Sequence, residues 1–341
     1  MLTIKPFLLN VLTKSRDKNI SAIELLDLQA KIAEKIIFCE KQMTIFKKTA
    51  NRETQNDEWR SREIYAAHRR MLMGIMDGVA FRFLNFDRPV LRQLAQHNQT
   101  GYLTIGFIEE IKKAEYITKK SGYYVILNDL TNYLRHGDLT IISPDKIYID
   151  EVKTSGKSKG DQKKILDELL EMLNKKSFRM GDQIADYIRI SGKPISYYQQ
   201  VEQIINRSKL IPGGIYTERI SPYLWVSSTS ISQIMKYFKE NGQLPNLPKM
   251  PFLIDDTSPS TNSLMFFDEF SPNIMPYSAF PFSEDNIVEI ITGQIQIKVV
   301  VNEKELVKSF KGRVGIWSFL PEMQLLLFTT LMTLTKLKKQ L

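Results

Sequence analysis

Hydrophobic positions recur at helical spacing through most of the first 120 residues. In the stretch that begins at Ser21 the apolar residues fall three or four apart, and Ser21 followed by Glu24 is a typical helix start. Phe86 to Pro89 is expected to end a second long helix, because the residue before proline leaves the helical region. The helices predicted here cover residues 21–49, 59–84, 90–97 and 105–119.

The pattern then changes to short runs rich in β-branched and aromatic residues. Three such runs follow each other, at 123–127, 138–142 and 147–154, and SPDK at 143–146 is typical of a turn between the last two. A strongly periodic stretch at 161–176 predicts a helix after them. The middle of the chain is therefore predicted to form three strands followed by a helix.

The remainder of the chain mixes both patterns. Helices are expected at 195–208 and 230–242, extended segments at 213–220 and 222–228, and a hairpin at 288–312. Taken together, the patterns predict an α/β protein with a mixed central sheet flanked by helices. We divide it into an N-terminal helical region at 1–58, a core at 59–180 and an α+β region at 181–341.

Composition narrows the class of partner. The chain has 341 residues, a formal net charge of +9 and a pI of about 9.3, which favours an acidic partner such as nucleic acid or an anionic membrane surface. Its one cysteine, Cys39, excludes an intrachain disulfide and a cysteine-built zinc site, and fits a reducing, cytoplasmic setting. The apolar stretch at 314–341 is interrupted by polar residues and proline, so a buried helix is preferred to a membrane-contacting one.

Two acidic positions and a lysine stand out on the predicted strands. Alternate side chains of a strand share a face, so Glu151 and Lys153 should lie next to each other while Asp150 points away. The turn after the second strand would bring Asp138, which follows Gly137, beside Glu151. The pattern thus predicts two carboxylates and an ammonium group converging at one end of a sheet.

This combination suits phosphodiester hydrolysis. Two carboxylates can bind a hard divalent cation such as Mg²⁺ and leave positions for water and a phosphate oxygen. The metal lowers the pKa of its water, and a lysine stabilises the charge that grows in the transition state. The alternative is that Asp138, Glu151 and Lys153 are ordinary charges on edge strands, since other acids and lysines lie in the same stretch.

The segments Gly137–Asp138 and Asp150–Lys153 resemble the PD-(D/E)xK nuclease superfamily, over roughly residues 59 to 176. The resemblance implies a restriction-endonuclease-like core. It also implies Mg²⁺, which Mn²⁺ could replace, held by Asp138, Glu151 and the backbone carbonyl of Val152, with Lys153 as the catalytic lysine. The proline of the superfamily's name is absent, because Gly137 occupies its position.

The superfamily often adds an acid from a preceding helix and a polar residue from the following one. Asp77 is the only acid in an apolar run and is a candidate metal ligand, with Glu63 on the same helical stripe as a second choice. The alternative for Asp77 is a salt bridge with Arg70 or Arg82. Gln162, at the start of the helix after the motif, is the candidate catalytic polar residue.

Basic residues near the motif are candidates for DNA contact. A helix start with free amides already favours phosphate, and four lysines surround the one predicted after the motif. The alternative is a solvated loop. The candidate nucleic-acid contacts are Arg135, Lys157, Lys159, Lys163 and Lys164.

The expected function is therefore a Mg²⁺-dependent endonuclease acting on DNA. Superfamily habit suggests bacterial genome defence, restriction or a mobile element as its setting. Two alternatives stay open: a DNA-binding module that does not cleave, and a subunit whose residues 181–341 bind a controlling protein partner. A homodimer with an interface along the helix at 21–49 is a further hypothesis, because cutting two strands needs two active sites.

Overall fold

The structure is a computed structural model that describes most of the chain in two compact units. The first unit comprises Met1–Ile188 with Pro272–Phe280, and the second comprises Arg189–Ser271 with Pro281–Leu341. The predicted division near residue 180 lies close to the first of these junctions, but the return of the chain at 272–280 was not predicted. The described residues are 4–54, 56–84, 103, 106–134, 136–152, 177–180, 183–186, 197–246, 261–266 and 277–302.

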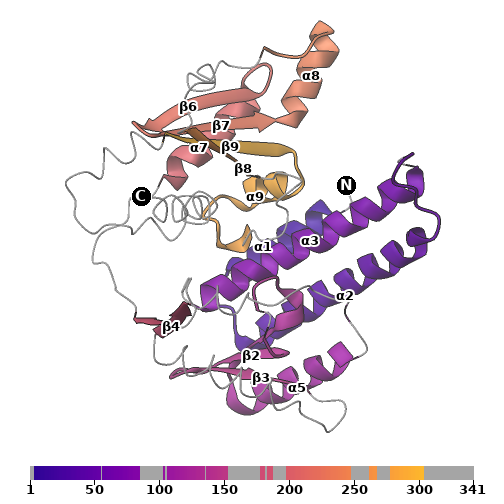
Figure 1. Ribbon diagram of the computed structural model, residues 1–341, viewed down its shortest axis with the longest axis vertical. Helices are drawn as coiled ribbons and strands as arrows, with labels where there is room; N and C mark the ends of the chain where they lie inside the picture. The colour runs from indigo at the N-terminus through magenta and orange to yellow at the C-terminus, as the bar shows by residue number, and fades with distance from the viewer. Residues whose placement is uncertain are drawn as a thin grey trace. The chain divides into compact units, whose positions relative to one another are not determined.

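Four described helices belong to the first unit, and they precede its strands (Figure 1). They are α1 Lys5–Arg16, α2 Ala22–Lys47, α3 Asp57–Phe83 and α5 Gly106–Ser121. The predicted start of α2 is confirmed. The Ser21 hydroxyl accepts a hydrogen bond from the Glu24 N–H at 3.2 Å, and the Glu24 carboxylate accepts one from the Ser21 N–H at 2.8 Å.

The core of the first unit forms where α2 and α3 pack along each other (Figure 1). Apolar residues three and four apart on both helices are removed from water, which is the main favourable contribution to folding. The fully buried side chains of this contact include Leu25, Leu28, Ile32 and Ile36 of α2 and Leu72, Met73, Ile75 and Met76 of α3.

Three strands form an antiparallel sheet in the order β1-β2-β3. They are β1 Tyr124–Leu127, β2 Leu139–Ile142 and β3 Ile147–Asp150, with a short 3-10 helix η1, Asn128–Leu130, after β1. Leu127 pairs with Leu139, and Leu139 pairs with Asp150. The prediction of a third strand reaching residue 154 is wrong at Glu151 and Val152, because β2 begins at Leu139 and offers β3 no partner beyond Asp150.

A glutamine of α2 completes the hydrogen bonding of β1. Gln29 is fully buried; its side-chain amide donates to the Val125 carbonyl, and its side-chain carbonyl accepts from the Leu127 N–H, both at 2.8 Å. The strand therefore has β2 on one edge and a helix side chain on the other. Exposed strand edges invite unwanted pairing, and this one is covered.

A short segment from late in the chain joins the first unit. The 3-10 helix η2, Tyr277–Ala279, packs against α3, and the Ser278 hydroxyl donates to the Ile75 carbonyl at 2.8 Å. Gly78 of α3 makes this possible. A Cβ atom at Gly78 would lie 2.2 Å from the Ser278 Oγ and 2.7 Å from the Ala279 nitrogen.

The second unit contains a four-stranded antiparallel sheet in the order β6-β7-β9-β8. The predicted helices at 195–208 and 230–242 and the extended segments at 213–220 and 222–228 all have counterparts. The described elements are α7 Tyr198–Leu210, β6 Ile215–Ser221, β7 Leu224–Ser230, α8 Ile231–Asn241, β8 Thr261–Phe266, α9 Glu284–Ile291 and β9 Ile295–Asn302.

The predicted hairpin at 288–312 is wrong in its first part. Residues 288–291 belong to α9, whose cap Ser283 accepts a hydrogen bond from the Asn286 N–H. The run of β-branched residues is buried on this helix instead of extended in a strand. Gly293 then turns the chain with a φ of 71° into β9, which pairs with β7 and β8.

The described elements make the protein a mixed α/β protein. Every described strand pairing is antiparallel, whereas the resemblance implies a sheet of mixed direction. A separate antiparallel pair is formed by β4 Ser177–Met180 and β5 Gln183–Asp186. None of the described helices is long and apolar enough to cross a membrane.

Candidate functional site

Asp138 lies at the end of the β1-β2-β3 sheet, where hydrogen bonds of its backbone N–H and carbonyl fix its position. Its N–H donates to the Asp150 carbonyl and its carbonyl accepts from the Asn128 N–H, both at 2.9 Å. Its carboxylate accepts a hydrogen bond from the Val152 N–H. Continuing the register of β2 and β3 beyond Leu139 and Asp150 sets Asp138 opposite Glu151, so the structure brings these two predicted residues together.

Asn128 is a positioning residue that the sequence reasoning missed. It is buried, and its side-chain amide donates to the carbonyls of His136 and Gly137 at 2.8 and 3.1 Å. Its side-chain oxygen accepts from the Thr140 hydroxyl at 2.8 Å. One side chain thus fixes the loop before Asp138 to the strand after it.

Gly137, directly before Asp138, has a backbone conformation that proline cannot adopt. Its φ is +64°, in the left-handed region, and proline is locked near −65°. A Cβ at this position would also lie 2.6 Å from the Ile149 Cγ2 and 2.8 Å from the Asp150 carbonyl oxygen. Only glycine fits the turn that delivers Asp138 to the end of β3.

A lysine of α5 binds the end of β3. Lys113 Nζ forms an ion pair with the Asp150 carboxylate at 2.7 Å and donates to the Glu151 carbonyl at 3.3 Å. The Asp150 carboxylate also accepts from the Glu151 N–H at 2.8 Å. Asp150, which the strand pattern separates from Glu151, is therefore bound by Lys113 of α5 and by the Glu151 N–H.

The Asp138 carboxyl lies in a negative, partly buried environment. Burial raises its pKa above the ordinary value, and the nearby charges of Asp129 and Glu151 raise it further. The Val152 N–H and the Lys113 ammonium act in the opposite direction. A cation placed here would remove the repulsion that these carboxylates exert on one another.

Glu110 of α5 is a second buried acid near Asp138. The sequence reasoning missed it. It is 6% exposed, and burial, followed by the charges of Asp129 and Asp138, raises the pKa of its carboxyl to about 8. Its Oε2 is buried and has no hydrogen-bond partner among the described residues. A buried carboxyl oxygen without a partner is costly unless it stays protonated or meets a cation.

A signal for Glu110 was present in the sequence. The buried positions of α5 are Phe107, Glu110, Ala114 and Thr118, spaced three and four apart. One acid therefore lies on the face that turns toward the sheet. Asp77 of α3 was predicted in its place because it is the only acid in the apolar run at 71–84.

Asp77, the predicted additional metal ligand, binds a loop of the first unit. It is completely buried in α3, where its carboxylate accepts hydrogen bonds from the backbone N–H and the side-chain amide of Asn132, at 2.5 and 2.7 Å. These bonds hold the loop after η1. The charge of Asp138 contributes to the raised pKa of Glu110, so an acid of α5 lies near Asp138. Glu63, the second choice, pairs with Arg62 at 3.8 Å.

The acidic side chains around Asp138 offer the oxygen ligands that a hard cation needs. Carboxylate oxygens are the preferred ligands of Mg²⁺ and Mn²⁺, and the orphaned Glu110 Oε2 fits such a group. No three acidic, histidine or cysteine side chains already converge at metal-binding distance within the described part of the chain. Asp138 and Glu151 stay candidate ligands, and together with Glu110 they do not form a metal-binding group as they are placed here.

Several predicted site residues lie outside the described residues. Lys153, the predicted catalytic lysine, and Gln162 are among them, as is the whole lysine-rich segment. The others in this group are Arg135, Lys157, Lys159, Lys163 and Lys164.

No protein-family profile, curated protein or solved structure matches the chain. The chain's own residues and their arrangement around Asp138 are therefore the basis for proposing a function.

Proposed function

We propose that the protein is a Mg²⁺-dependent nuclease that hydrolyses phosphodiester bonds in DNA. The observation that supports this best is the meeting of Asp138 with Glu151 at the end of an antiparallel sheet, directly after a helix that carries the buried acid Glu110. The order of one helix and three strands also supports a restriction-endonuclease-like core. Lys153, the predicted catalytic lysine, follows Glu151 by two residues in the sequence.

In this proposal the carboxylates of Asp138 and Glu151 would hold the ion, which would supply a water of lowered pKa and polarise the scissile phosphate. Glu110, whose carboxyl pKa is raised to about 8, would be the neighbouring acid that keeps its proton at neutral pH. Lys153 stabilises the negative charge that develops on the phosphate oxygens. Lys113, bound to Asp150, keeps the end of β3 against α5.

The DNA itself would be held by positive charge. The net charge of +9 favours a polyanion, and Arg135, Lys157, Lys159, Lys163 and Lys164 are the proposed backbone contacts. A setting in bacterial genome defence, restriction or a mobile element remains part of the proposal by resemblance alone.

A second function is favoured by one specific observation. The Asp138 carboxylate accepts a hydrogen bond from the Val152 N–H, and the described residues contain no ready-made group of three metal ligands. A protein that binds DNA with this fold and does not cleave it would have the same features. Such a module shows salt-sensitive affinity without metal-dependent products.

The test is plasmid cleavage by the purified full-length chain with Mg²⁺ or Mn²⁺. The Glu151→Ala variant is expected to lose metal-dependent nicking and linearisation by at least about a hundredfold, because a metal ligand is removed. Glu109→Gln is the matched control, since Glu109 is exposed on α5 and pairs with Lys112 at 2.7 Å. It should cleave like the unmodified chain.

Two results would decide against the nuclease. Equal cleavage by the unmodified chain and the Glu151→Ala variant would mean a contaminating enzyme. Salt-sensitive DNA binding with no cleavage in either metal would favour the non-cleaving module.

A further inference from the structure

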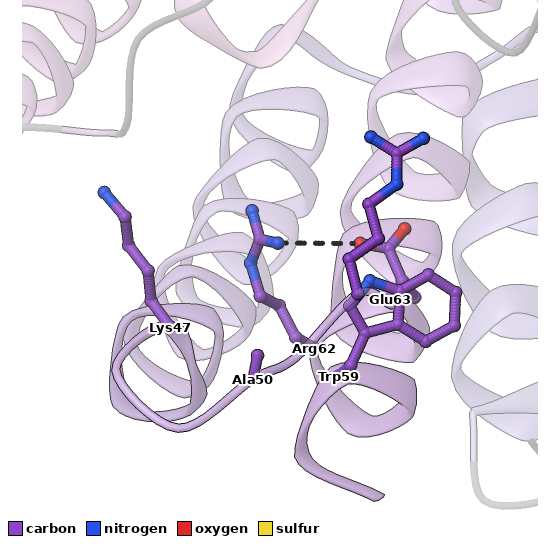
Figure 2. Close-up of a pocket in the computed structure, with 6 residues that line it drawn as sticks. Lys47, Ala50, Trp59, Arg62 and Glu63 are labelled. Carbon is purple, nitrogen blue, oxygen red and sulfur yellow. Dashed lines mark ion pairs between the residues drawn. The ribbon is translucent and has the colours of Figure 1, made fainter. Parts of the chain in front are cut away.

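A pocket of about 360 Å³ lies where α2 ends and α3 begins (Figure 2). Its volume falls within the range of small-molecule sites, roughly 300 to 1,000 Å³. Lys47 is the last residue of α2, and Trp59, Arg62 and Glu63 belong to the first two turns of α3. The lining residues are Lys47, Ala50, Arg52, Trp59, Arg62 and Glu63.

The connection that forms the pocket is held by hydrogen bonds of its own. Asn51 accepts from the N–H groups of Glu53 and Thr54 at 2.9 and 3.2 Å. Asn56 accepts from the N–H groups of Asn51 and Trp59 at 2.9 and 3.0 Å, and its amide donates to the Thr49 carbonyl at 2.9 Å. The wall between the two helices is therefore shaped before any ligand arrives.

The lining carries net positive charge beside an aromatic ring. Arg62 pairs with Glu63 at 3.8 Å, and Figure 2 shows the Arg62 guanidinium between Lys47 and Glu63. This pair is self-compensating, so Lys47 and Arg52 supply the excess charge. Both are exposed, and the Nε of Arg62 is buried without a partner among the described residues. Trp59 is half-buried and provides a flat apolar surface.

We propose that this pocket binds a nucleotide, with its base against the Trp59 indole and its phosphate on Lys47 and Arg52. Bases stack on aromatic side chains whatever their identity, and guanidinium groups bind phosphate through paired N–H donors. The same chemistry occurs in a free nucleotide and in a nucleotide of a DNA strand. The experiment separates these two sources.

The pocket is distant from Asp138. Gln29, which bonds β1, and Lys47, which lines the pocket, are eighteen residues apart on α2, which is about 27 Å of helix. No single nucleotide reaches both places. The inference therefore does not depend on the proposed nuclease function, and either can fail alone.

The test is calorimetric titration of the full-length chain in EDTA, so that no metal-dependent site contributes. The probes are ATP, adenosine, inorganic tripolyphosphate and the single strand (dA)10. ATP or (dA)10 should bind saturably and at least about fivefold more tightly than adenosine or tripolyphosphate, because stacking and charge both contribute. Tighter binding of ATP identifies a free nucleotide, and tighter binding of (dA)10 identifies a strand.

Variants locate the binding. Trp59→Leu should weaken it about fivefold or more by removing the stacking surface, and Arg52→Gln should weaken it by removing a phosphate contact. Arg60→Gln is the matched control: Arg60 is exposed on the same helix, pairs with Asp57 at 3.6 Å and does not line the pocket. No saturable binding of ATP or (dA)10, or equal losses in Trp59→Leu and Arg60→Gln, would overturn the inference.

Discussion

Glu110 links the chemistry of the site to the stability of the fold. Its pKa is about 8 in the folded chain and near 4.5 as a free side chain, because burial disfavours its charged form. The folded state therefore holds a proton that the unfolded state has released between these values. The contribution of Glu110 to the free energy of unfolding therefore falls as pH rises from about 4.5 to 8, and is level beyond that range.

Replacing Glu110 with glutamine should remove this dependence. Between pH 5 and 8, the melting temperature of the unmodified chain is expected to fall more than that of Glu110→Gln. The difference should be about 2–4 °C for each kcal/mol that Glu110 contributes to the pH dependence of the free energy of unfolding. Thermal melts of both proteins at several pH values measure it, with Glu109→Gln as the control on the same helix. Parallel curves for all three proteins would mean that Glu110 does not titrate as described.

Gly137 controls the position of Asp138. Alanine here meets both a left-handed backbone and the atoms of Ile149 and Asp150, and we expect a loss of roughly 3 kcal/mol or more in the free energy of unfolding. Gly122→Ala separates the two causes, since its φ is +71° and nothing lies within 4 Å of its Cβ position. It should cost about 1–2 kcal/mol. Denaturant unfolding of both variants tests this, and equal losses would contradict it.

At the level of elements, α2 supports the sheet through Gln29. The change Gln29→Leu keeps the side-chain volume but leaves the Val125 carbonyl and the Leu127 N–H without partners in a buried place. Each unsatisfied group should cost about 1–3 kcal/mol in the free energy of unfolding. Gln42→Leu, on a less buried part of α2, should change it by less than about 0.5 kcal/mol. Urea titrations compare them, and a neutral Gln29→Leu would show that the edge of β1 tolerates exposure.

Sequence patterns predicted those elements whose local signals agree with their packing. The start of α2 was predictable because Ser21 and Glu24 form their capping contacts within one turn. The end of β3 was not, because it depends on where β2 begins, and Gly137 decides that thirteen residues earlier. The run at 288–291 was misread because β-branched residues favour strands, whereas the cap at Ser283 and burial beside β9 favour a helix.

The candidate site was predictable only in part, because some of its residues are brought together by packing between distant segments. Asp138 directly precedes β2 and Glu151 directly follows β3, so the pairing of these strands and one turn relate them. Glu110 reaches the site from a helix, and nothing in the spacing of the sequence says which helix covers the sheet. Asn128 and Lys113 bind backbone carbonyls as well as side chains, and bonds to backbone carbonyls leave no pattern of residue types in the sequence.

For the whole molecule, the contact of η2 with α3 is the feature most open to test. Valine at Gly78 would collide with the backbone of Ser278 and Ala279, and the free energy of unfolding should fall by about 1–3 kcal/mol. Amide hydrogen exchange at Tyr277–Phe280 should rise with it. Ala66→Val, on the same helix, carries only the helix-propensity cost of well under 1 kcal/mol. If both variants exchange alike at these amides, η2 does not depend on Gly78.

The return of the chain at 272–280 also sets an order of events during synthesis. The ribosome must add the 83 residues from Arg189 to Ser271 before the segment that completes the first unit has been made. At ordinary translation speeds of about 5–20 residues per second, this takes roughly 4 to 17 seconds. Throughout that interval the face of α3 around Gly78 is without η2, and a chaperone or a second nascent chain could reach it first.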